Sequence, residues 1–218
     1  MPVTNTLIYL YDPLCGWCYG ASRAVAEFAL DGWTVRPIPT GLFAGHPGRR
    51  LDPAMEAHIW QADQRIAQLS GQPFTEAYRE QVLRDPTMPF DSGPATVALT
   101  AVATQAPARE RAALAAVQRA RWVEGRDIAD PAVLAEVAGA AFDDPALAQR
   151  TQARVERGQR LMQEFGFGGV PALIALAGHE DDEAALVERA IREGEPVSNS
   201  TLFDGSLAAA LRQTVRAA

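Results

Sequence analysis

The sequence has few cysteines, no long apolar run and no block of basic residues. Only 2 of its 218 residues are cysteines, which excludes a framework of several disulfides. No run approaches the roughly 20 apolar residues of a membrane-spanning helix. The first apolar run, Leu7 to Tyr11, is too short for a secretory signal and lacks a basic start. We therefore expect a cytoplasmic protein that does not enter a membrane.

The charge balance argues against nucleic acid as a partner. There are 27 acidic and 20 basic residues, so the formal net charge is −7, and an acidic surface repels nucleic acid and anionic lipid. The run 166–169 is rich in glycine but lacks the spacing of a phosphate-binding loop. No flavin or nicotinamide motif is present, and we expect no bound cofactor.

Hydrophobic periodicity predicts an α/β domain that is interrupted by helices. A buried strand is expected over Leu7–Tyr11, a helix over 15–30, and a second strand over about 33–40, whose two prolines make it either irregular or an edge strand at that end. Residues 53–165 are predicted to be almost entirely helical. The first of these helices has an apolar stripe at spacings of four and three, formed by Met55, Ile59, Ala62, Ile66 and Leu69.

Strand character returns after the helical segment. An apolar strand is predicted over 172–177, a helix over 181–193, and a short strand at Thr201-Leu202-Phe203, before Ser206 caps a final helix. We therefore predict one α/β domain built from residues 1–44 and 168–218. Residues 45–167 would form an all-helical insertion domain.

Both cysteines lie in one motif, Cys15-Gly16-Trp17-Cys18, where a helix opens after a buried strand. The unpaired N–H groups and the dipole of a helix stabilise an anion at that end, and a thiolate is the attacking species in disulfide exchange. A spacing of one helical turn brings the two sulfurs within bonding reach. We predict that Cys15, at the exposed end, attacks and that Cys18, one turn deeper, resolves the mixed disulfide.

The two residues inside the motif offer the thiolate neither a cation nor a strong polar partner. A histidine there would stabilise the reduced form and make the pair more oxidising. Because Gly16 and Trp17 do not, we expect a mild oxidant, a reductant or an isomerase.

Two other interpretations of the pair are weaker. A zinc site needs further ligands, and His46, His58 and His179 do not have the spacing of a ligand pair, so no metal is expected. Two inert core thiols are disfavoured because the start of the helix is expected to be exposed.

Gly169-Val170-Pro171 is the second sequence feature of interest. A proline at the mouth of a strand can hold a cis peptide bond, but it can equally be a plain strand-initiating proline. Local sequence does not choose between the two, and only the cysteine motif raises the odds of the cis bond.

Three stretches carry a family resemblance: residues 11–20, Asp91-Ser92-Gly93-Pro94-Ala95, and Gly169-Val170-Pro171. The chain resembles the DsbA-like branch of the thioredoxin superfamily over nearly its whole length, and in particular the predicted protein-disulfide isomerases related to FrnE. The resemblance implies a thioredoxin-like α/β fold with a large helical insertion. It departs from the family at 178–195, where the family usually has a tight hairpin between the last strands.

The resemblance also implies roles for individual residues. Cys15 would be the nucleophile, Cys18 the resolving thiol and Pro171 a cis-proline facing them. The backbone of Val170 would pair with an extended substrate segment. Trp17 would line the substrate surface, although packing against the insertion explains it equally well. Asp12 is interpreted as a turn residue rather than a proton acceptor.

We therefore predict a thiol–disulfide oxidoreductase of the protein disulfide reductase or isomerase type. Its substrates would be protein or small-molecule thiols and disulfides, with glutathione or another dithiol protein as the electron partner. A glutathione-linked transferase or isomerase on the same fold is one alternative, and a non-catalytic binding module is the other. Cys18 discriminates, because exchange with protein disulfides needs it and a glutathione transferase does not.

Overall fold

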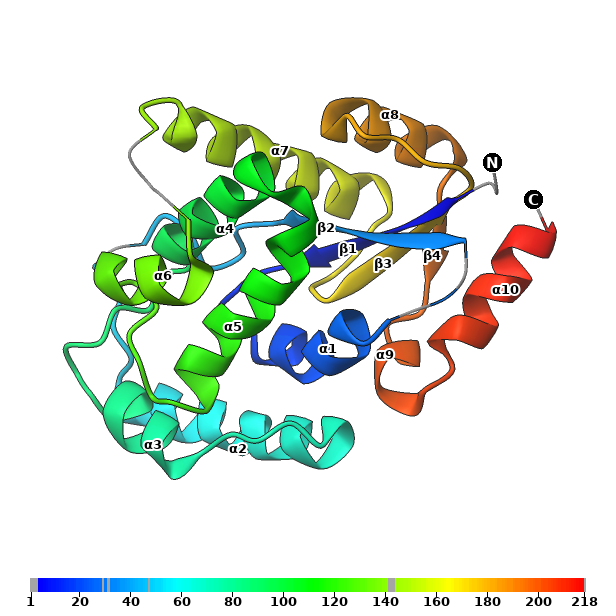
Figure 1. The fold of residues 1–218 in the computed structure, drawn as a ribbon. Helices are drawn as coiled ribbons and strands as arrows, with labels where there is room; N and C mark the ends of the chain where they lie inside the picture. Colours follow the sequence, from blue (N-terminus) through cyan, green and yellow to red (C-terminus); the bar gives the residue numbers. More distant parts are fainter. Residues whose placement is uncertain (1–3, 29, 31, 47, 141–143, 218) are drawn as a thin grey trace.

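The computed structural model describes residues 4–28, 30, 32–46, 48–140 and 144–217, the last three by their backbone alone. Within these residues a mixed sheet is covered by helices on both faces (Figure 1). The strand order is β2-β1-β3-β4, with β1 and β2 parallel and β3 antiparallel to both of its neighbours. The strands are β1 (Asn5–Tyr11), β2 (Trp33–Pro39), β3 (Ala172–Leu176) and β4 (Glu195–Val197).

β1 lies inside the sheet and is buried on both faces. The side chains from Leu7 to Tyr11 are at most 1% exposed, as expected for a continuous apolar strand between two layers of helices. β2 lies at an edge, where its Pro37 and Pro39 stand opposite Tyr9 and Tyr11. An edge strand tolerates residues that cannot donate a hydrogen bond, so the predicted position of β2 is confirmed.

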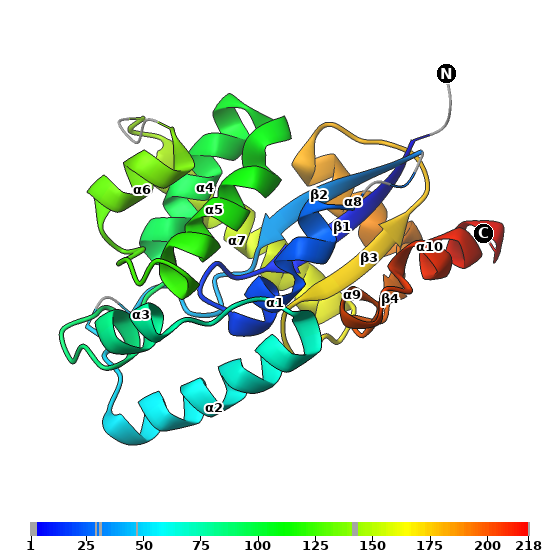
Figure 2. The same ribbon diagram turned by 60° about the horizontal axis from the view of Figure 1, so that its bottom comes forward.

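The helices that flank the sheet are divided between its two sides (Figures 1 and 2). On one side lie α1 (Gly16–Ala26), α9 (Thr201–Asp204) and α10 (Leu207–Ala217). On the other side lie α7 (Leu147–Glu164) and α8 (Glu183–Glu193). The helix predicted from residue 15 is confirmed at its start, but it ends at Ala26, earlier than predicted.

The segment between β2 and β3 is helical, as predicted. Asp52 and Asp130 cap two of its helices by accepting hydrogen bonds from the N–H groups of Met55 and Ala132. In Figure 2, α2 runs beneath α1, while α5 packs against α1 and α4 and α6 lie on the other side of α5. Besides α7, the elements are α2 (Pro53–Ser70), α3 (Glu76–Tyr78), a π-helical turn (Arg79–Leu83), α4 (Gly93–Gln105), a 3-10 turn (Pro107–Arg109), α5 (Glu110–Trp122) and α6 (Pro131–Ala138).

The apolar stripe predicted for α2 is wrong at both of its ends. Met55 is 39% exposed and Leu69 is 51% exposed. The buried residues of α2 are Asp63 and Ile66, in the part of the helix that meets α1. The stripe is therefore interrupted by a buried carboxyl that periodicity alone does not reveal.

The strand predicted at Thr201-Leu202-Phe203 is also wrong, because these residues begin α9. The Thr201 hydroxyl donates to the carbonyl of Ser198 over 2.7 Å and closes a helical turn, and Gly205, with φ of 76°, ends the helix. The last strand is instead β4, which pairs with β3. The predicted helix α8 lies between these two strands in the chain, in place of a tight hairpin.

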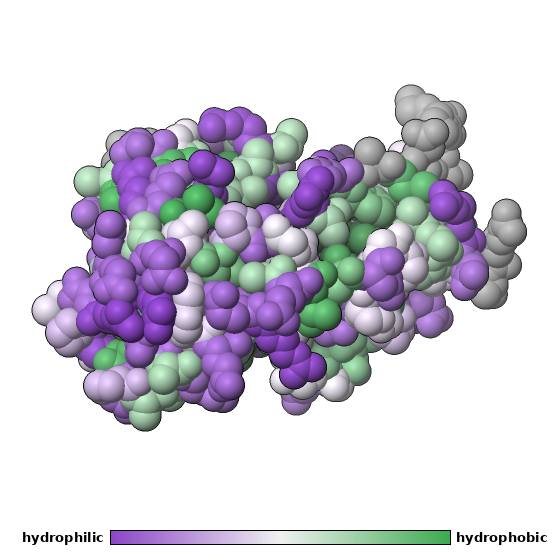
Figure 3. Space-filling model, turned by 90° about the horizontal axis from the view of Figure 1, so that it is seen from below, coloured by the Kyte–Doolittle hydropathy of each residue, from purple (hydrophilic) through white to green (hydrophobic). Residues whose placement is uncertain are grey.

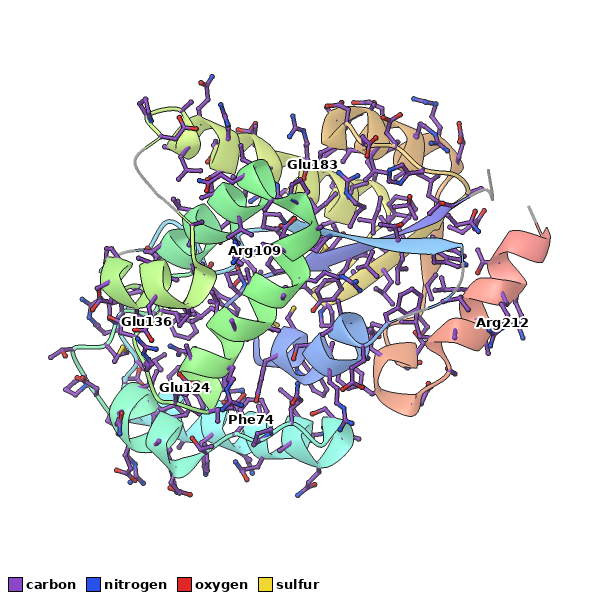
Figure 4. All side chains as sticks on the ribbon, viewed as in Figure 1. Phe74, Arg109, Glu124, Glu136, Glu183 and Arg212 are labelled. Atoms are coloured by element: carbon purple, nitrogen blue, oxygen red, sulfur yellow. The ribbon has the colours of Figure 1, made fainter. Side chains whose placement is uncertain are left out.

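Two apolar clusters hold the fold together. The larger runs from the sheet into α4 and α5. The smaller is an aromatic cluster in which Tyr19 of α1 stacks on Trp122 of α5 at 4.8 Å, with Phe74 and Tyr78 around them (Phe74 is labelled in Figure 4). α1 is thus packed against helices of the insertion as well as against the sheet. The predicted domain boundaries at 44/45 and 167/168 stay a prediction.

Candidate active site

The cysteine pair lies at the start of α1. Cys15 is the N-cap residue with extended backbone, and Cys18 lies one turn further along. Both thiols are free. Cys18 is fully buried and Cys15 is only 7% exposed, so the expectation of an exposed Cys15 is wrong. The cause is the loop before β3, because the Cys15 thiol donates to the carbonyl of Val170 at 3.5 Å.

The inner thiol is strongly disfavoured as a thiolate. Burial raises the pKa of Cys18 well above its usual value, and a hydrogen bond with the Cys15 side chain raises it further. A backbone hydrogen bond from Asp12 acts in the opposite direction and lowers that pKa. The two sulfurs therefore differ in access, and the inner one is held in its neutral form.

The Val170–Pro171 peptide bond is cis, which decides between the two interpretations of this proline. Pro171 stands directly before β3, and its carbonyl accepts a hydrogen bond from the Asn199 side chain at 3.3 Å. The loop before β3 thus places the Val170 carbonyl against the Cys15 thiol at the start of α1.

Asp12 is a fully buried carboxylate between β1 and α1. It accepts hydrogen bonds from the N–H groups of Leu14 (2.8 Å) and Phe43 (3.0 Å) and from the hydroxyl of Ser92 (2.8 Å). Burial raises the pKa of Asp12, and the three hydrogen bonds partly oppose that rise. The bond from Leu14 fits the predicted turn role, the bond from Phe43 ties this turn to the segment after β2, and the bond from Ser92 ties it to the insertion.

The Asp91-Ser92 pair lies at the start of α4. Ser92 occupies the N-cap position, but its hydroxyl makes no capping bond because it is turned towards Asp12. The carboxylate of Asp91 accepts from the N–H groups of Gly93 (2.8 Å) and Gly45 (3.1 Å) instead. This explains the middle stretch of the family resemblance, which joins the insertion to the turn before the cysteines.

Trp17 lies on the wall of a cavity of about 820 Å³ beside the cis-proline. It is 36% exposed and meets the ring of Phe203 edge-to-face at 5.6 Å. Its packing partner is thus in α9, outside the insertion, although Leu69 of α2 lines the same cavity. Figure 3 shows hydrophobic surface in this region, between α2 on the left and the helices α9 and α10 on the right.

A second cavity of about 450 Å³ lies on the other side of the loop before β3. Leu42 and Met162 line it, and Phe167 and Val170 line both cavities. The loop that carries the cis-proline therefore forms a ridge between two hollows. An extended segment lying across the ridge would pass close to Cys15.

One ionisable residue at the site was missed by the sequence analysis. Asp63 of α2 is 3% exposed, and its Oδ1 atom would lie 2.6 Å from a Cβ atom added to Gly16. Its other oxygen accepts a hydrogen bond from Tyr78 at 2.8 Å. The available signal was an acidic residue four positions after Ile59 and three before Ile66, within the apolar stripe.

A buried ion-pair network lies elsewhere in the fold, between α5, α7 and α8. Arg154 contacts Glu110 and Glu183, each at 2.8 Å, and Glu183 at the start of α8 is labelled against α7 in Figure 4. Burial raises the pKa of Glu110 to about 7 despite the attraction of Arg154. The network joins the insertion to α8.

The described residues show neither a cluster of metal ligands nor a membrane helix. No group of three or more His, Cys, Asp or Glu side chains among them is arranged to hold a metal ion. None of the described helices has the length and apolar composition needed to cross a membrane.

A free dithiol at the start of a helix, opposite a cis-proline and on a sheet of this topology, defines a class of protein. That class is the thiol–disulfide oxidoreductases with a thioredoxin fold.

Comparison with solved structures specifies the family. The chain is 32% identical to the cytosolic disulfide reductase DsbM from Pseudomonas aeruginosa, with a TM-score of 0.74 over 98% of this chain and 100% of that chain. DsbM has also been solved with GSH, at 32% identity and a TM-score of 0.74, over 97% of this chain and 98% of that one. This chain belongs to the DsbA-like thioredoxin-fold family, and it is a thiol–disulfide oxidoreductase. No protein-family model and no curated protein sequence matches it.

Two more distant structures share the fold. A candidate protein disulfide isomerase from Nitrosomonas europaea is 24% identical, with a TM-score of 0.72 over 98% of this chain and 97% of that chain. A 2-hydroxychromene-2-carboxylate isomerase is 18% identical, with a TM-score of 0.55 over 98% and 99%. The predicted thioredoxin-like fold with a helical insertion is confirmed, and the specific relation to FrnE stays a prediction.

Proposed function

We propose that this chain reduces disulfides with electrons from a small thiol such as glutathione, using Cys15 as nucleophile and Cys18 as resolving thiol. The observation that carries the proposal is the difference between the two sulfurs. Cys15 caps α1 beside the cis-proline loop, whereas Cys18 has no exposed surface and burial raises its pKa. A substrate can therefore approach only the outer sulfur.

The reaction consists of two exchanges. The Cys15 thiolate attacks one sulfur of the substrate disulfide, the substrate S–S bond breaks, and the leaving thiolate takes up a proton. Cys18 then gives up its proton and attacks the Cys15 sulfur, which releases the second substrate thiol and leaves the Cys15–Cys18 disulfide. The substrate gains two electrons and the enzyme loses two. Two molecules of a monothiol return them, and no bound cofactor is required.

Substrate would lie across the ridge formed by the loop before β3. Strand addition supplies main-chain hydrogen bonds to an extended segment, and the backbone of Val170, which precedes Pro171, lies against the Cys15 thiol. The cavities on either side of the ridge would take alternate side chains, with Trp17 forming part of one wall. Protein disulfides and small disulfides both fit this arrangement.

Glutathione as electron partner and a cytoplasmic location are supported by one relative. DsbM is described as cytosolic and has been solved with GSH. A glutathione-rich, reducing compartment favours an enzyme that works as a reductase. The net charge of −7 gives no support to nucleic acid or anionic membrane as a partner.

The test is turnover of insulin disulfides with glutathione as the sole electron source. Wild type is expected to be active, and Cys15→Ser to lose at least roughly 1,000-fold because the attacking sulfur is gone. Cys18→Ser is expected to accumulate a mixed disulfide on Cys15 and to turn over far more slowly than wild type, because glutathione from solution must then resolve it. An active Cys15→Ser variant would contradict the proposal, and full turnover by Cys18→Ser would favour a glutathione-linked transferase or isomerase.

A further inference from the structure

The second residue of the cysteine motif is in contact with a carboxyl group from the insertion. α1 and α2 cross where α1 carries Gly16 and, one turn later, Gly20. A Cβ atom on Gly16 would lie 2.6 Å from Asp63 Oδ1 and 3.3 Å from Ile66, and one on Gly20 would collide with Ile66. Because Gly16 and Gly20 have no side chains, α2 can pack closely against α1, and the Asp63 carboxyl lies against the first turn of α1.

Asp63 is buried and has few partners. Tyr78 of α3 donates to it at 2.8 Å, and Arg121 of α5 attracts its charge. Burial outweighs both and raises the pKa of Asp63 to about 7. The nearby Arg79 of the π-helical turn is engaged with Glu56 at 3.8 Å. Besides burial, the Tyr78 hydroxyl and the Arg121 charge are thus the groups that act on the pKa of Asp63.

The position of Asp63 matters because the start of α1 is where a Cys15 thiolate needs stabilisation. The free N–H groups and the dipole make this end positive, and they act on any anion within the first turn. An ionised Asp63 beside Gly16 competes with the thiolate for the same positive field and repels it directly. A neutral Asp63 does neither.

We propose that Asp63 is a positioning residue that sets the reduction potential of the Cys15–Cys18 couple, its ionised form keeping the couple reducing and its neutral form allowing a stable Cys15 thiolate. The inference rests on the exchange function proposed above and adds its regulation by pH. It assigns to the insertion a direct electrostatic action on the dithiol, beyond covering the site.

The proton balance follows from this arrangement. When two monothiols reduce the disulfide, the couple gains two electrons, Cys18 takes one proton, and Cys15 becomes a thiolate or a thiol. Where Cys15 becomes a thiolate, the second proton goes to Asp63. When a substrate disulfide oxidises the couple again, the negative charge on Cys15 disappears and Asp63 releases that proton. The potential is therefore expected to depend on pH through the neutral range.

The test compares three chains: wild type, Asp63→Asn and Asp52→Asn. The amide keeps the size of the carboxyl and can still accept from Tyr78. Asp52 is the exposed N-cap of the same helix, where asparagine caps equally well, so the control removes the same charge far from the dithiol. The fraction of protein in the disulfide form is measured at defined ratios of reduced to oxidised glutathione, from about pH 5.5 to pH 8.5.

Asp63→Asn is expected to shift the equilibrium towards the dithiol by roughly tenfold at about pH 8, equal to about 30 mV for a two-electron couple. At about pH 5.5, where Asp63 is neutral in wild type, the shift should shrink to within about twofold. Asp52→Asn should follow wild type throughout. An Asp63→Asn profile that coincides with the Asp52→Asn profile at pH 8 would overturn the inference.

A measurement on the wild-type chain guards against a variant that folds poorly. The Asp63 carboxyl carbon is followed by NMR against pH in the disulfide form and in the form reduced by dithiothreitol. A titration midpoint that is higher in the reduced form supports the inference, and equal midpoints refute it. A wild-type dithiol that never equilibrates with glutathione would contradict the proposed function alone, because the NMR comparison does not use glutathione.

Discussion

The dithiol is held between two regions that act on it by different means. The turns of the sheet, after β1 and before β3, reach it through backbone atoms, namely the Val170 carbonyl and the main chain of Asp12. The helical insertion acts through side chains, with Asp63 against Gly16 and Ser92 on the Asp12 carboxylate. Backbone groups have the same charge at every pH, whereas carboxyl groups titrate. The sheet therefore fixes the geometry of the couple, and the insertion can tune it.

The two carboxyls beside α1 show the same contrast. Burial raises the pKa of both, but Asp12 accepts three hydrogen bonds that oppose the rise, while Tyr78 gives Asp63 one. Several donors favour the ionised form of a carboxyl group and so limit the rise in its pKa. Asp63, with one donor and a partial counter-charge from Arg121, is the group poised to change its charge near neutrality.

The largest effect on stability is expected when Asp63, the buried carboxyl of the insertion, is replaced by a neutral residue. The pKa of Asp63 is raised from 3.8 to about 7 by folding, so the native state binds this proton more tightly than the unfolded chain does. Stability from this group is present below about pH 4 and is lost as pH rises through about 7. Asp63→Asn avoids the loss, and at about 1.4 kcal/mol per unit of pKa shift it should exceed wild-type stability by on the order of 4 kcal/mol at pH 8.

Urea unfolding from about pH 4.5 to pH 8 measures this difference, with Asp52→Asn as the control for a lost surface charge. The buried Glu110, with a pKa raised to about 7, adds its own pH dependence to all three chains and cancels in the comparison. Parallel profiles for wild type and Asp63→Asn would show that Asp63 is not the titrating group.

The next largest effect on stability is expected where α7 of the insertion packs against β2. A Cβ atom on Gly158 of α7 would collide with the carbonyl oxygen of Pro39 in β2. Gly158→Ala should destabilise the fold by about 2–3 kcal/mol and lower Tm by roughly 6–10 °C. Gly168→Ala is the control, since an added Cβ there meets nothing within 4 Å. Equal melting temperatures for the two variants would mean that α7 can move away from β2 at little cost.

Removing the Ser92 hydroxyl, which belongs to the insertion, should have a smaller effect on stability. Ser92→Ala leaves one oxygen of the buried Asp12 with one donor fewer, which should cost about 1–2 kcal/mol of the free energy of unfolding and raise the pKa of Asp12 further. Ser198→Ala removes an exposed hydroxyl bonded to Ser200 and should stay within about 0.5 kcal/mol of wild type. Denaturant titration at neutral pH compares the two variants. Indistinguishable midpoints would refute a stabilising role for the hydrogen bond from Ser92 to Asp12.

The smallest effect is expected at the cavity wall. Trp17→Ala loses an edge-to-face contact with Phe203, worth about 0.5–1.5 kcal/mol, and should raise KM for a peptide disulfide roughly three- to tenfold while kcat changes little. Met55→Ala removes an apolar side chain of similar exposure from the first turn of α2, which does not line the cavity, and should leave KM unchanged. Steady-state kinetics on both variants would reject the role of Trp17 if their KM values agree.

Local sequence was sufficient for the sheet's contribution to the site. The strand, the cysteine helix and the Val-Pro turn are each encoded within about ten residues, so their positions could be predicted. The contact of Asp63 with Gly16 could not, because it depends on the crossing of two helices that are far apart in the chain. Burial of Cys15 was missed for the same reason, since the Val170 carbonyl covers it from 155 residues away. The segment Thr201-Leu202-Phe203 was misassigned as a strand because Thr201 closes a helical turn through its own hydroxyl.

The most direct test of the account is the order in which the two cysteines react. The reduced, folded chain is treated with a limiting amount of iodoacetamide, then unfolded and labelled with a second, distinguishable reagent, and the labels are mapped by mass spectrometry. The account predicts that the first label falls on Cys15 with a preference of at least roughly tenfold, because the buried Cys18 is inaccessible and held as a thiol. Equal labelling of the two cysteines, or a first label on Cys18, would contradict it.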